Sequence, residues 1–397
     1  MLLFSPLALE VAPPPDIAIQ NVAGNPSIAF YLVLFVLSLV FGLAGTPLVR
    51  RLALRTGVVD APSARKIHVA PVPLLGGAAI YLGFMLTVTA LSYWVLPFYI
   101  LQLAAIVLGG SFMFFIGLLD DKWGLSPYVK LGAQIIAALW LIWTGVIIEA
   151  LQNDWLNVGA TFIWIIVITN AINFLDNMDG LSAGISAIAA GFFFLAAYLS
   201  GQWMVAAMGA AMAGAAAGFV YHNFGIIKQG KAIFMGDSGS LFLGYILAAI
   251  GIKLRFNNTY FVTWMVPVLI LGLPLFDITL VVISRLRRRL SPLRGGKDHT
   301  SHRLVALGLN KRETVLVIYL ICGALGVAAL VVTGASIGDG YMVGGLVALL
   351  FGWSLIRLEQ IPLINTNPAI QGYSKNPGTM ATPDLPETSF KPPKSGG

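Results

Sequence analysis

Acidic residues with catalytic potential stand where apolar segments of this sequence end. Asp120 and Asp121 are adjacent at the end of one such segment. Neighbouring carboxylates repel each other unless a cation or a basic group lies between them. A solvated helix end also tolerates such a pair, so the two residues alone do not define a site. Together with the groups described next, Asp120 and Asp121 predict general-base or metal chemistry.

Oxygen-bearing side chains then recur at every third residue. The series is Asn170, Asn173, Asp176 and Asp179, followed directly by Gly180. On a helix of about 3.6 residues per turn, this step keeps neighbouring members on one face. Oxygens gathered in this way suit a hard cation, or the edge of a nucleobase and a ribose. A polar hairpin between two helices is the alternative.

Glycines surround a third acid, at the start of another apolar segment. Asp237 lies between Gly236 and Gly239. Glycines at a helix N-terminus let a phosphate approach the backbone amides, where the helix dipole favours an anion. A carboxylate there can carry a magnesium ion that bridges this phosphate. The alternative is an ordinary helix cap, with Asp237 or Ser238 as the N-cap residue.

Histidines and cations accompany these acids. His299 and His302 are three residues apart and are followed by Arg303, a set that suits a pyrophosphate. Zinc is a weaker interpretation, because a third and a fourth ligand are missing. Lys66 and His68 add a cation and an imidazole earlier in the chain. Together these groups predict a magnesium-dependent reaction of phosphates at a membrane surface.

The composition places these residues in a membrane protein. The 397 residues are 58% hydrophobic and only 10% charged, against roughly 25% charged residues in a soluble domain. The single cysteine, Cys322, excludes an internal disulfide framework and a cysteine-based zinc site. The net charge of +7 does not indicate a nucleic-acid partner, because so few charges are carried. Met1 to Pro15 lack the basic start of a cleaved signal peptide.

Eleven apolar segments approach the length of about 20 residues that a membrane-spanning helix needs. They are predicted near residues 28–49, 72–95, 98–119, 129–149, 159–176, 180–200, 203–221, 237–253, 262–284, 313–334 and 340–357. The expected fold is therefore an all-α polytopic membrane protein with about 11 transmembrane helices. Residues 1–27 are expected to be extracytoplasmic, residues 28–357 to form the integral membrane domain, and residues 358–397 to be a disordered cytoplasmic tail.

Basic residues predict the orientation, because loops rich in Lys and Arg stay on the cytoplasmic side. With eleven segments, every Lys and Arg except Lys253 and Arg255 falls on one side. This predicts an N-terminus outside and a C-terminus in the cytoplasm. The run Arg285–Arg289 is interpreted as a topology anchor that contacts anionic lipids.

Acids collect on the same predicted side as the cations, so the active site is expected on the cytoplasmic face of the plasma membrane. A lipid or sugar transporter is the competing class of protein. Transporters usually place their charges near the midplane of the bilayer and often contain inverted repeats. The acids here lie at one face, and the motifs are not repeated.

The motifs resemble those of the polyprenyl-phosphate N-acetylhexosamine-1-phosphate transferase superfamily, glycosyltransferase family 4. The resemblance is to the branch that uses UDP-N-acetylglucosamine and undecaprenyl phosphate. The residues that carry it are, in the family's order, Arg65–His68 with Pro71, Pro73 and Gly76–Gly77; Asp120–Asp121; Asn170, Asn173, Asp176 and Asp179–Gly180; Phe234–Ser240; Pro274–Asp277; and Asp298–Arg303. The resemblance covers residues 28–357.

The resemblance implies a reaction and roles for the acids. N-acetylglucosamine 1-phosphate would pass from UDP-N-acetylglucosamine to undecaprenyl phosphate, giving UMP and the lipid diphosphate sugar. Asn173 and Asp237 would bind Mg²⁺, with Mn²⁺ as the alternative metal, and Asp237 would also be catalytic. Asp120 would be the base for the lipid phosphate. Asp121 would orient that phosphate or support the metal, and Lys130 would pair with it.

The resemblance also implies a set of substrate-binding residues. They are Lys66, His68, Lys130, Asp176, Asp179, Phe234, His299, His302 and Arg303. Asp179 and the backbone near Phe234 would recognise uracil, and the last three would bind the diphosphate or the sugar phosphate.

One departure from the family's pattern concerns the donor sugar. Relatives commonly carry a third histidine where this chain has Thr300 and Ser301. The superfamily member that transfers phospho-N-acetylmuramoyl-pentapeptide typically has three consecutive histidines there, so the smaller sugar is favoured and the larger one stays an alternative. Direct attack is favoured over a covalent aspartyl intermediate, because a deprotonated lipid phosphate is already a nucleophile. A homodimer is compatible with the sequence, which contains no interface motif.

Overall fold

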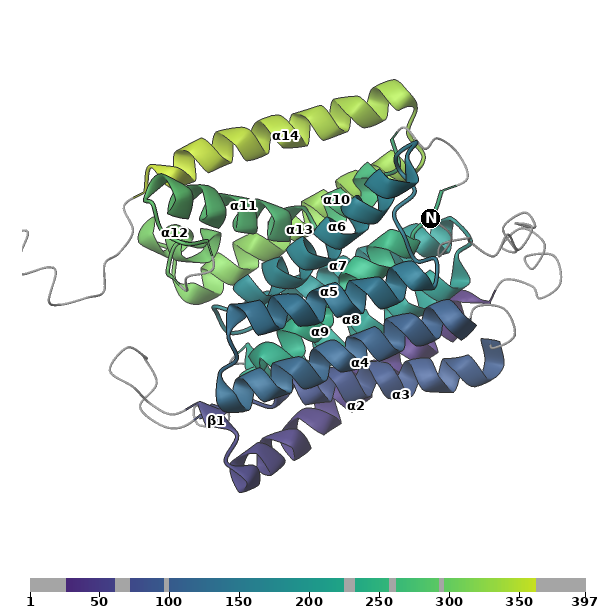
Figure 1. Cartoon of the computed structure of the whole chain (residues 1–397), viewed down its shortest axis with the longest axis vertical. Coiled ribbons are helices and arrows are strands. Elements are labelled where there is room, and N and C mark those ends of the chain that lie inside the picture. Colours follow the sequence, from purple (N-terminus) through teal and green to yellow (C-terminus); the bar gives the residue numbers. More distant parts are fainter. Residues whose placement is uncertain are drawn as a thin grey trace, which may run out of the picture.

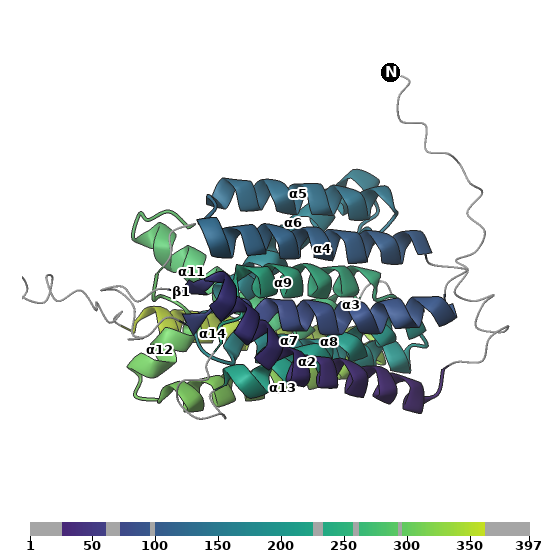
Figure 2. The same ribbon diagram turned by 90° about the horizontal axis from the view of Figure 1, so that it is seen from below.

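Long apolar helices make up most of the described chain. The structure is a computed structural model, and it describes residues 26–60, 72–95, 100–224, 233–256, 262–292 and 296–361. The helices lie side by side with similar axial directions, and β1 and α12 lie at the same end of the bundle (Figures 1 and 2).

The helices are α2 (Ile28–Thr56), α3 (Gly76–Val95), α4 (Ile100–Trp123), α5 (Pro127–Trp143), α6 (Asp154–Phe174), α7 (Leu181–Leu199), α8 (Trp203–Asn223), α9 (Gly236–Lys253), α10 (Met265–Ile270), α11 (Gly272–Arg287), α12 (Thr300–Ala306), α13 (Lys311–Thr333) and α14 (Ile337–Glu359). Strands β1 (Val59–Asp60) and β2 (Val72–Pro73) pair antiparallel, with Val59 opposite Pro73.

The predicted all-α membrane fold is confirmed. Each of the eleven predicted segments contains a helix. Within the described ranges, 7 helices are long and apolar enough to cross a membrane. The number of eleven spans and the orientation of the termini stay predictions. The expected N-terminal segment and C-terminal tail lie almost wholly outside the described residues.

Several predicted boundaries were wrong by a few residues, for example the end of α5 at Trp143 and the start of α6 at Asp154, and two others change the interpretation. Helix α2 continues to Thr56, so Arg50, Arg51 and Arg55 lie on its last turns and not in a loop. The segment predicted over 262–284 is two helices, which meet at Leu271. Pro274 in the first turn of α11 has no backbone N–H for the carbonyl group of residue 270, and this favours the break.

Helix α9 is the central element of the bundle. Nearly all of its residues from Gly236 to Ile252 are buried, which is expected for a helix that is apolar on every side. It packs against α3, α4, α6 and α7. Its N-terminal end therefore lies among the ends of neighbouring helices, where their polar residues meet.

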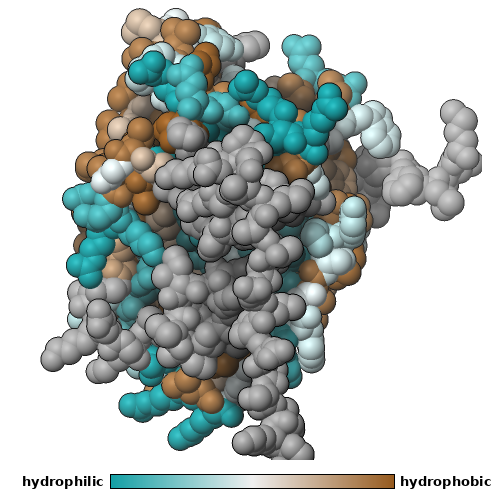
Figure 3. Space-filling view, turned by 90° about the vertical axis from the view of Figure 1, so that its left-hand side faces the viewer, coloured by the Kyte–Doolittle hydropathy of each residue, from teal (hydrophilic) through white to brown (hydrophobic). Residues whose placement is uncertain are grey.

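Apolar side chains cover the outer helices. Leu32 and Val36 on α2 are exposed, as are Leu349 and Trp353 on α14. Exposed apolar surface of this extent is expected where lipid replaces water. Hydrophilic residues are spread over the end of the bundle that carries β1 and α12 (Figure 3).

The two cations predicted to face outward lie at the other end of α9 from Asp237. An α-helix rises about 1.5 Å per residue, so the length of α9 separates Lys253 from Asp237. Lys253 donates to the Oε1 atom of Gln102 (2.7 Å). Arg255 pairs with Glu149 (3.0 Å). Both cations thus have local partners at this end of the bundle.

Candidate active site at the start of the central helix

A lysine joins two of the predicted acids. The Nζ atom of Lys130, on the first turn of α5, lies 2.9 Å from Oδ2 of Asp120 and 2.8 Å from Oδ2 of Asp237. The other oxygen of Asp120 accepts a hydrogen bond from the backbone N–H of Leu125 (2.5 Å). Helices α4, α5 and α9 therefore meet at one cation. The Asp237 side chain stays 30% exposed, so it remains accessible to a ligand.

Asp121 faces the backbone at the start of α9. Its Oδ1 accepts from the N–H of Asp237 (2.7 Å), and its Oδ2 accepts from the N–H of Ser238 (3.1 Å). The N-cap residue of α9 is Met235, which makes no side-chain cap. A carboxylate from α4 thus satisfies amides that a helix start leaves unpaired.

This contact corrects two expectations about α9. Neither Asp237 nor Ser238 is the N-cap residue, because the helix begins at Gly236. The amides of Asp237 and Ser238, predicted to receive a phosphate, are already bonded to Asp121. The Asp237 carboxylate, freed from capping, points to Lys130 instead.

Gly117 allows α4 and α9 to approach this closely. A Cβ atom at position 117 would overlap the backbone of Asp237 and Ser238. We expect Gly117→Ala to push the two helices apart, destabilising the protein by about 1–3 kcal/mol through overpacking, and to lower kcat because Asp120 moves relative to Asp237. Melting temperature and turnover in detergent measure both effects.

Gly132→Ala is the matched control for Gly117→Ala. Gly132 lies on α5, and a Cβ atom there would meet no heavy atom of the described part of the chain within 4 Å. Its melting temperature and kcat should equal those of the unsubstituted protein or exceed them slightly. Equal behaviour of the two variants would contradict a requirement for close contact between α4 and α9.

The series of amides and carboxylates does not continue on one helix. Helix α6 ends at Phe174, so only Asn170 and Asn173 share a helical face. The expectation that all four residues lie on one helical face was wrong, and the alternative of a polar turn between two helices holds for Asp176 and Asp179. Asn173 donates from Nδ2 to the hydroxyl of Ser240 on α9 (2.8 Å). This contact places Asn173 against the first turns of α9.

Asp176 and Asp179 lie in the turn between α6 and α7. Their side chains keep solvent contact, but surrounding protein displaces much of the water around Asp176. This desolvation raises the pKa of Asp176 well above its ordinary value, and the charges of Asp237, Asp121 and Asp179 raise it further. Desolvation also raises the pKa of Asp179. The turn therefore belongs to the same negatively charged region as α9.

The donor set fits a hard divalent cation that is shared with a substrate. Among the described residues, no group of three or more His, Cys, Asp and Glu could hold a metal ion by itself. Mg²⁺ usually binds through one or two carboxylates, with substrate phosphates and water completing its shell. Asp237 offers a carboxylate, and the side-chain oxygen of Asn173 has no hydrogen-bond partner within the described ranges. The carboxylates at the start of α9 carry more negative charge than Lys130 alone can neutralise. This excess of negative charge favours the binding of an additional cation.

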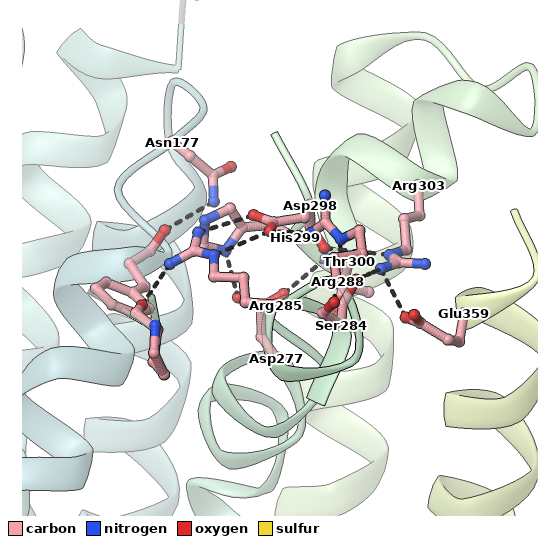
Figure 4. Close-up of polar contacts among 12 residues, drawn as sticks. Asn177, Asp277, Ser284, Arg285, Arg288, Asp298, His299, Thr300, Arg303 and Glu359 are labelled. Carbon is pink, nitrogen blue, oxygen red and sulfur yellow. Dashed lines mark hydrogen bonds and ion pairs between the residues drawn. The ribbon is translucent and has the colours of Figure 1, made fainter. Parts of the chain in front are cut away.

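A second polar cluster surrounds α12 (Figure 4). The Nδ1 atom of His299 lies 2.8 Å from Oδ2 of Asp277 on α11, and Oδ1 of Asp277 accepts from the N–H of Thr300 (2.6 Å). The hydroxyl of Ser301 donates to Oδ1 of Asn177 (2.7 Å). Because Asn177 lies between Asp176 and Asp179, this bond connects the turn after α6 to α12.

Asp298 pairs with two arginines of the basic run. Arg285 donates from Nε and Nη2 to the two carboxylate oxygens (2.9 and 2.8 Å), and Arg288 donates to Oδ2 (2.7 Å). Burial opposes ionisation of Asp298, but these hydrogen bonds and charges outweigh it and lower its pKa to about 2. Arg285 is only 2% exposed, so the interpretation of this residue as a lipid contact was wrong.

Arg303 is enclosed by protein groups. Its guanidinium donates to the carbonyl of Asp298 (3.1 Å), to the hydroxyl of Ser284 (2.8 Å) and to the carboxylate of Glu359 (2.9 Å). A further bond reaches the carbonyl of Leu358 (2.6 Å). With a side chain 1% exposed, Arg303 joins α12 to the end of α14. This leaves contact with the donor mainly to the histidines.

His302 lies beside His299, with the two ring centres 6.2 Å apart. Burial and the nearby charges of His299 and Lys297 lower the pKa of His302 to about 4. The His302 ring is therefore neutral at pH 7 and can donate one hydrogen bond. Both nitrogen atoms would donate only after protonation.

Backbone groups fix Phe234 in place. Its N–H donates to the carbonyl of Pro73 (2.8 Å), and its carbonyl accepts from the N–H of Gly76 (2.9 Å). Its ring is half-buried. The predicted residues Lys66 and His68 lie outside the described residues.

Sequence reasoning missed the contacts that hold the predicted residues. Ser240, Asn177, Ser301 and Glu359 were given no role, although the first three contact or lie within the predicted motifs. Asp277 stood in a motif without a role. In the sequence, each of these residues is only a polar residue in or beside a motif. Such a position does not identify which side chain the residue will contact.

Comparison with known proteins identifies the family of this chain. Residues 103–255, which include Asp120, Lys130, Asn173 and Asp237, match the model of glycosyl transferase family 4. The chain is 35% identical over 315 residues to a probable undecaprenyl-phosphate N-acetylglucosaminyl 1-phosphate transferase of Bacillus subtilis (strain 168), covering 77% of this chain and 86% of that protein. The chain therefore belongs to glycosyl transferase family 4, as its motifs predict.

Two further relatives have related activities in their names. A decaprenyl-phosphate N-acetylglucosaminephosphotransferase of Mycolicibacterium smegmatis is 32% identical over 358 residues, covering 81% of this chain and 85% of the relative. An undecaprenyl-phosphate alpha-N-acetylglucosaminyl 1-phosphate transferase of Escherichia coli (strain K12) is 28% identical over 290 residues, covering 70% and 77%. These relatives support the predicted branch of the family.

Proposed function

We propose that this protein transfers N-acetylglucosamine 1-phosphate from UDP-N-acetylglucosamine to undecaprenyl phosphate. The products are UMP and a lipid diphosphate sugar, which starts a cell-envelope glycan. The observation that carries the proposal is the position of Lys130 between Asp120 and Asp237. Phosphoryl transfer needs mainly positioned charges, and this arrangement supplies a base and a cation beside a carboxylate that is open to a ligand.

The reaction is a substitution at phosphorus. Asp120 takes the proton of the lipid phosphate, and Lys130 holds the resulting anion. An oxygen of the lipid phosphate forms a bond to the β-phosphorus of the donor, while the bond from that phosphorus to the bridging oxygen breaks. The electron pair of the broken bond leaves with UMP. We favour this direct attack over an enzyme-bound intermediate.

Charge neutralisation is the other requirement of this transfer. Asp237 and Asn173 would hold Mg²⁺, with Mn²⁺ as the alternative, and the ion would neutralise donor phosphates and stabilise the leaving group. Asp121 serves the site by holding the start of α9, so that Asp237 faces Lys130.

Donor binding falls to the turn after α6 and to α12. Asp176 and Asp179 lie where uridine hydroxyl or imide groups could donate to carboxylates. His299 and His302 would contact the phosphates or the sugar. On the predicted topology these residues lie at the cytoplasmic face of a multi-pass plasma-membrane protein, where UDP-sugars are available.

Release of UMP tests the proposed function. Full-length protein in detergent, with Mg²⁺ and undecaprenyl phosphate, should release UMP from UDP-N-acetylglucosamine, and omission of either substrate should stop release. EDTA should abolish turnover and added Mg²⁺ should restore it. UDP-N-acetylgalactosamine and UDP-N-acetylmuramoyl-pentapeptide, tested in parallel, should be poorer donors. No release from any of the three donors would contradict the proposal.

A further inference from the structure

Asp277 is a buried acid without a role in the mechanism above. It lies on α11 and is 1% exposed. Burying a carboxylate is costly unless its oxygens receive hydrogen bonds. Both oxygens receive one, from the N–H of Thr300 and from Nδ1 of His299. The whole carboxylate is thus directed at the first residues of α12 (Figure 4).

These contacts define the orientation of His299. Because Asp277 accepts from Nδ1, this nitrogen carries a proton, and Nε2 points away from Asp277. The His299 ring also packs edge-on against Phe174, with the ring centres 5.9 Å apart. A partner at Nδ1 and a neighbour at the ring together restrict its rotation. Within the described residues, Nε2 has no hydrogen-bond partner.

The neighbours of His299 place its ring next to the candidate site. Phe174 directly follows Asn173, which contacts α9. Ser301, two residues after His299, bonds to Asn177 in the turn that carries Asp176. A donor bound between α9 and this turn would therefore extend toward His299.

We propose that Asp277 is a positioning residue, which holds His299 so that Nε2 faces a phosphate oxygen of the UDP-sugar donor. A hydrogen bond to phosphate needs a proton on Nε2 as well as on Nδ1. His299 then binds the donor as an imidazolium between two anions, the Asp277 carboxylate and the phosphate. A partner on the far nitrogen of a histidine commonly orients the ring for its ligand in this way. The inference rests on the proposed function.

A double-mutant cycle with Asp277→Asn and His299→Ala tests this inference. The asparagine keeps the size of Asp277 and one oxygen for the N–H of Thr300. Binding of UDP-N-acetylglucosamine with Mg²⁺ is measured by calorimetry in detergent, alongside kcat and KM for UMP release. Each single substitution should weaken donor binding roughly tenfold, which corresponds to the loss of one oriented charge-assisted hydrogen bond. The double variant should bind no more weakly than His299→Ala alone.

Thr314→Val is the control for loss of a buried polar group. The Thr314 hydroxyl, at the start of α13, is buried and has no hydrogen-bond partner among the described residues, so this variant should bind the donor normally. KM for undecaprenyl phosphate should be unchanged in Asp277→Asn, because His299 acts on the donor. A merely structural role would change both KM values together.

Several results would overturn the inference. One is an affinity for UDP-N-acetylglucosamine that is unchanged in Asp277→Asn. Another is an affinity of the double variant that is lowered by the product of the two single effects. If Asp277→Asn does not fold, Asp277→Ser replaces it in the same cycle, and failure of both to fold would show that Asp277 serves only the fold. An unsubstituted protein that neither binds UDP-N-acetylglucosamine nor releases UMP would instead refute the proposed function itself.

Discussion

Asp237→Asn is expected to lower kcat by a factor of about a thousand or more, as the loss of a major electrostatic contribution to phosphoryl transfer does. The substitution removes the carboxylate that faces Lys130 and is proposed to hold the metal. It should also raise the Mg²⁺ concentration needed for half-maximal activity. The bonds that fix the start of α9 use the backbone N–H of Asp237, so the melting temperature should change little.

Asp154→Asn is the matched control for this substitution. Asp154 is exposed at the start of α6, at the opposite end of that helix from Asn173. Turnover should therefore be the same as in the unsubstituted protein. Normal turnover in Asp237→Asn, or an unchanged requirement for Mg²⁺, would contradict the role proposed for Asp237.

Asp120→Asn is expected to lower kcat by a factor of about 100 to 10,000, the range for loss of a general base. The asparagine keeps one oxygen, which can accept from the backbone N–H of Leu125. The ion pair with Lys130 is lost, but Lys130 keeps its contact with Asp237, so the local structure should persist. Because Asp120 is not a proposed metal ligand, the dependence on Mg²⁺ should stay normal. Titrations of Mg²⁺ with both variants separate the two roles.

A shift in the Mg²⁺ requirement of Asp120→Asn as large as that of Asp237→Asn would contradict this division of roles. It would mean that the two carboxylates act as a single metal site. Full activity of Asp120→Asn would exclude it as the base, and the lipid phosphate would then react without a protein acceptor for its proton.

The helical fold could be predicted because apolar segments of about 20 residues are recognisable in the sequence as membrane-spanning helices. The helix boundaries were less accurate, since they depend on local contacts. The extension of α2 to Thr56 is an example, because charged residues such as Arg50 and Arg51 continue a helix once it has formed. Likewise, the end of α6 at Phe174 is not visible in a pattern that repeats every third residue through Asp179.

The acids of the candidate site could be predicted by type and position, but not by partner. Lys130 and Asp237 are separated by 107 residues, and only the packing of α4 against both α5 and α9 brings them together. The different partners of Asp120 and Asp121 were also hidden, because adjacent residues on a helix point in different directions. One therefore contacts Lys130, and the other holds the start of α9.

The partners of the charged residues in the basic loop could not be predicted from the sequence either. In the sequence, Arg285 and Arg303 differ little from the arginines that set topology. In the structure, both are buried with acids and carbonyl groups. A buried arginine requires such partners, but the partners come from α11, from the segment between α11 and α12, and from α14, and they cannot be identified from the spacing alone.

The fate of the β-phosphorus of the donor tests most directly whether the protein transfers the sugar together with its phosphate. UDP-N-acetylglucosamine labelled with ³²P at the β-phosphate is incubated with the full-length protein, Mg²⁺ and undecaprenyl phosphate, and the lipid fraction is extracted. Transfer of the sugar together with its phosphate predicts that the label moves into the lipid and that unlabelled UMP is released. Label that remains in UDP while the sugar enters the lipid would contradict the account.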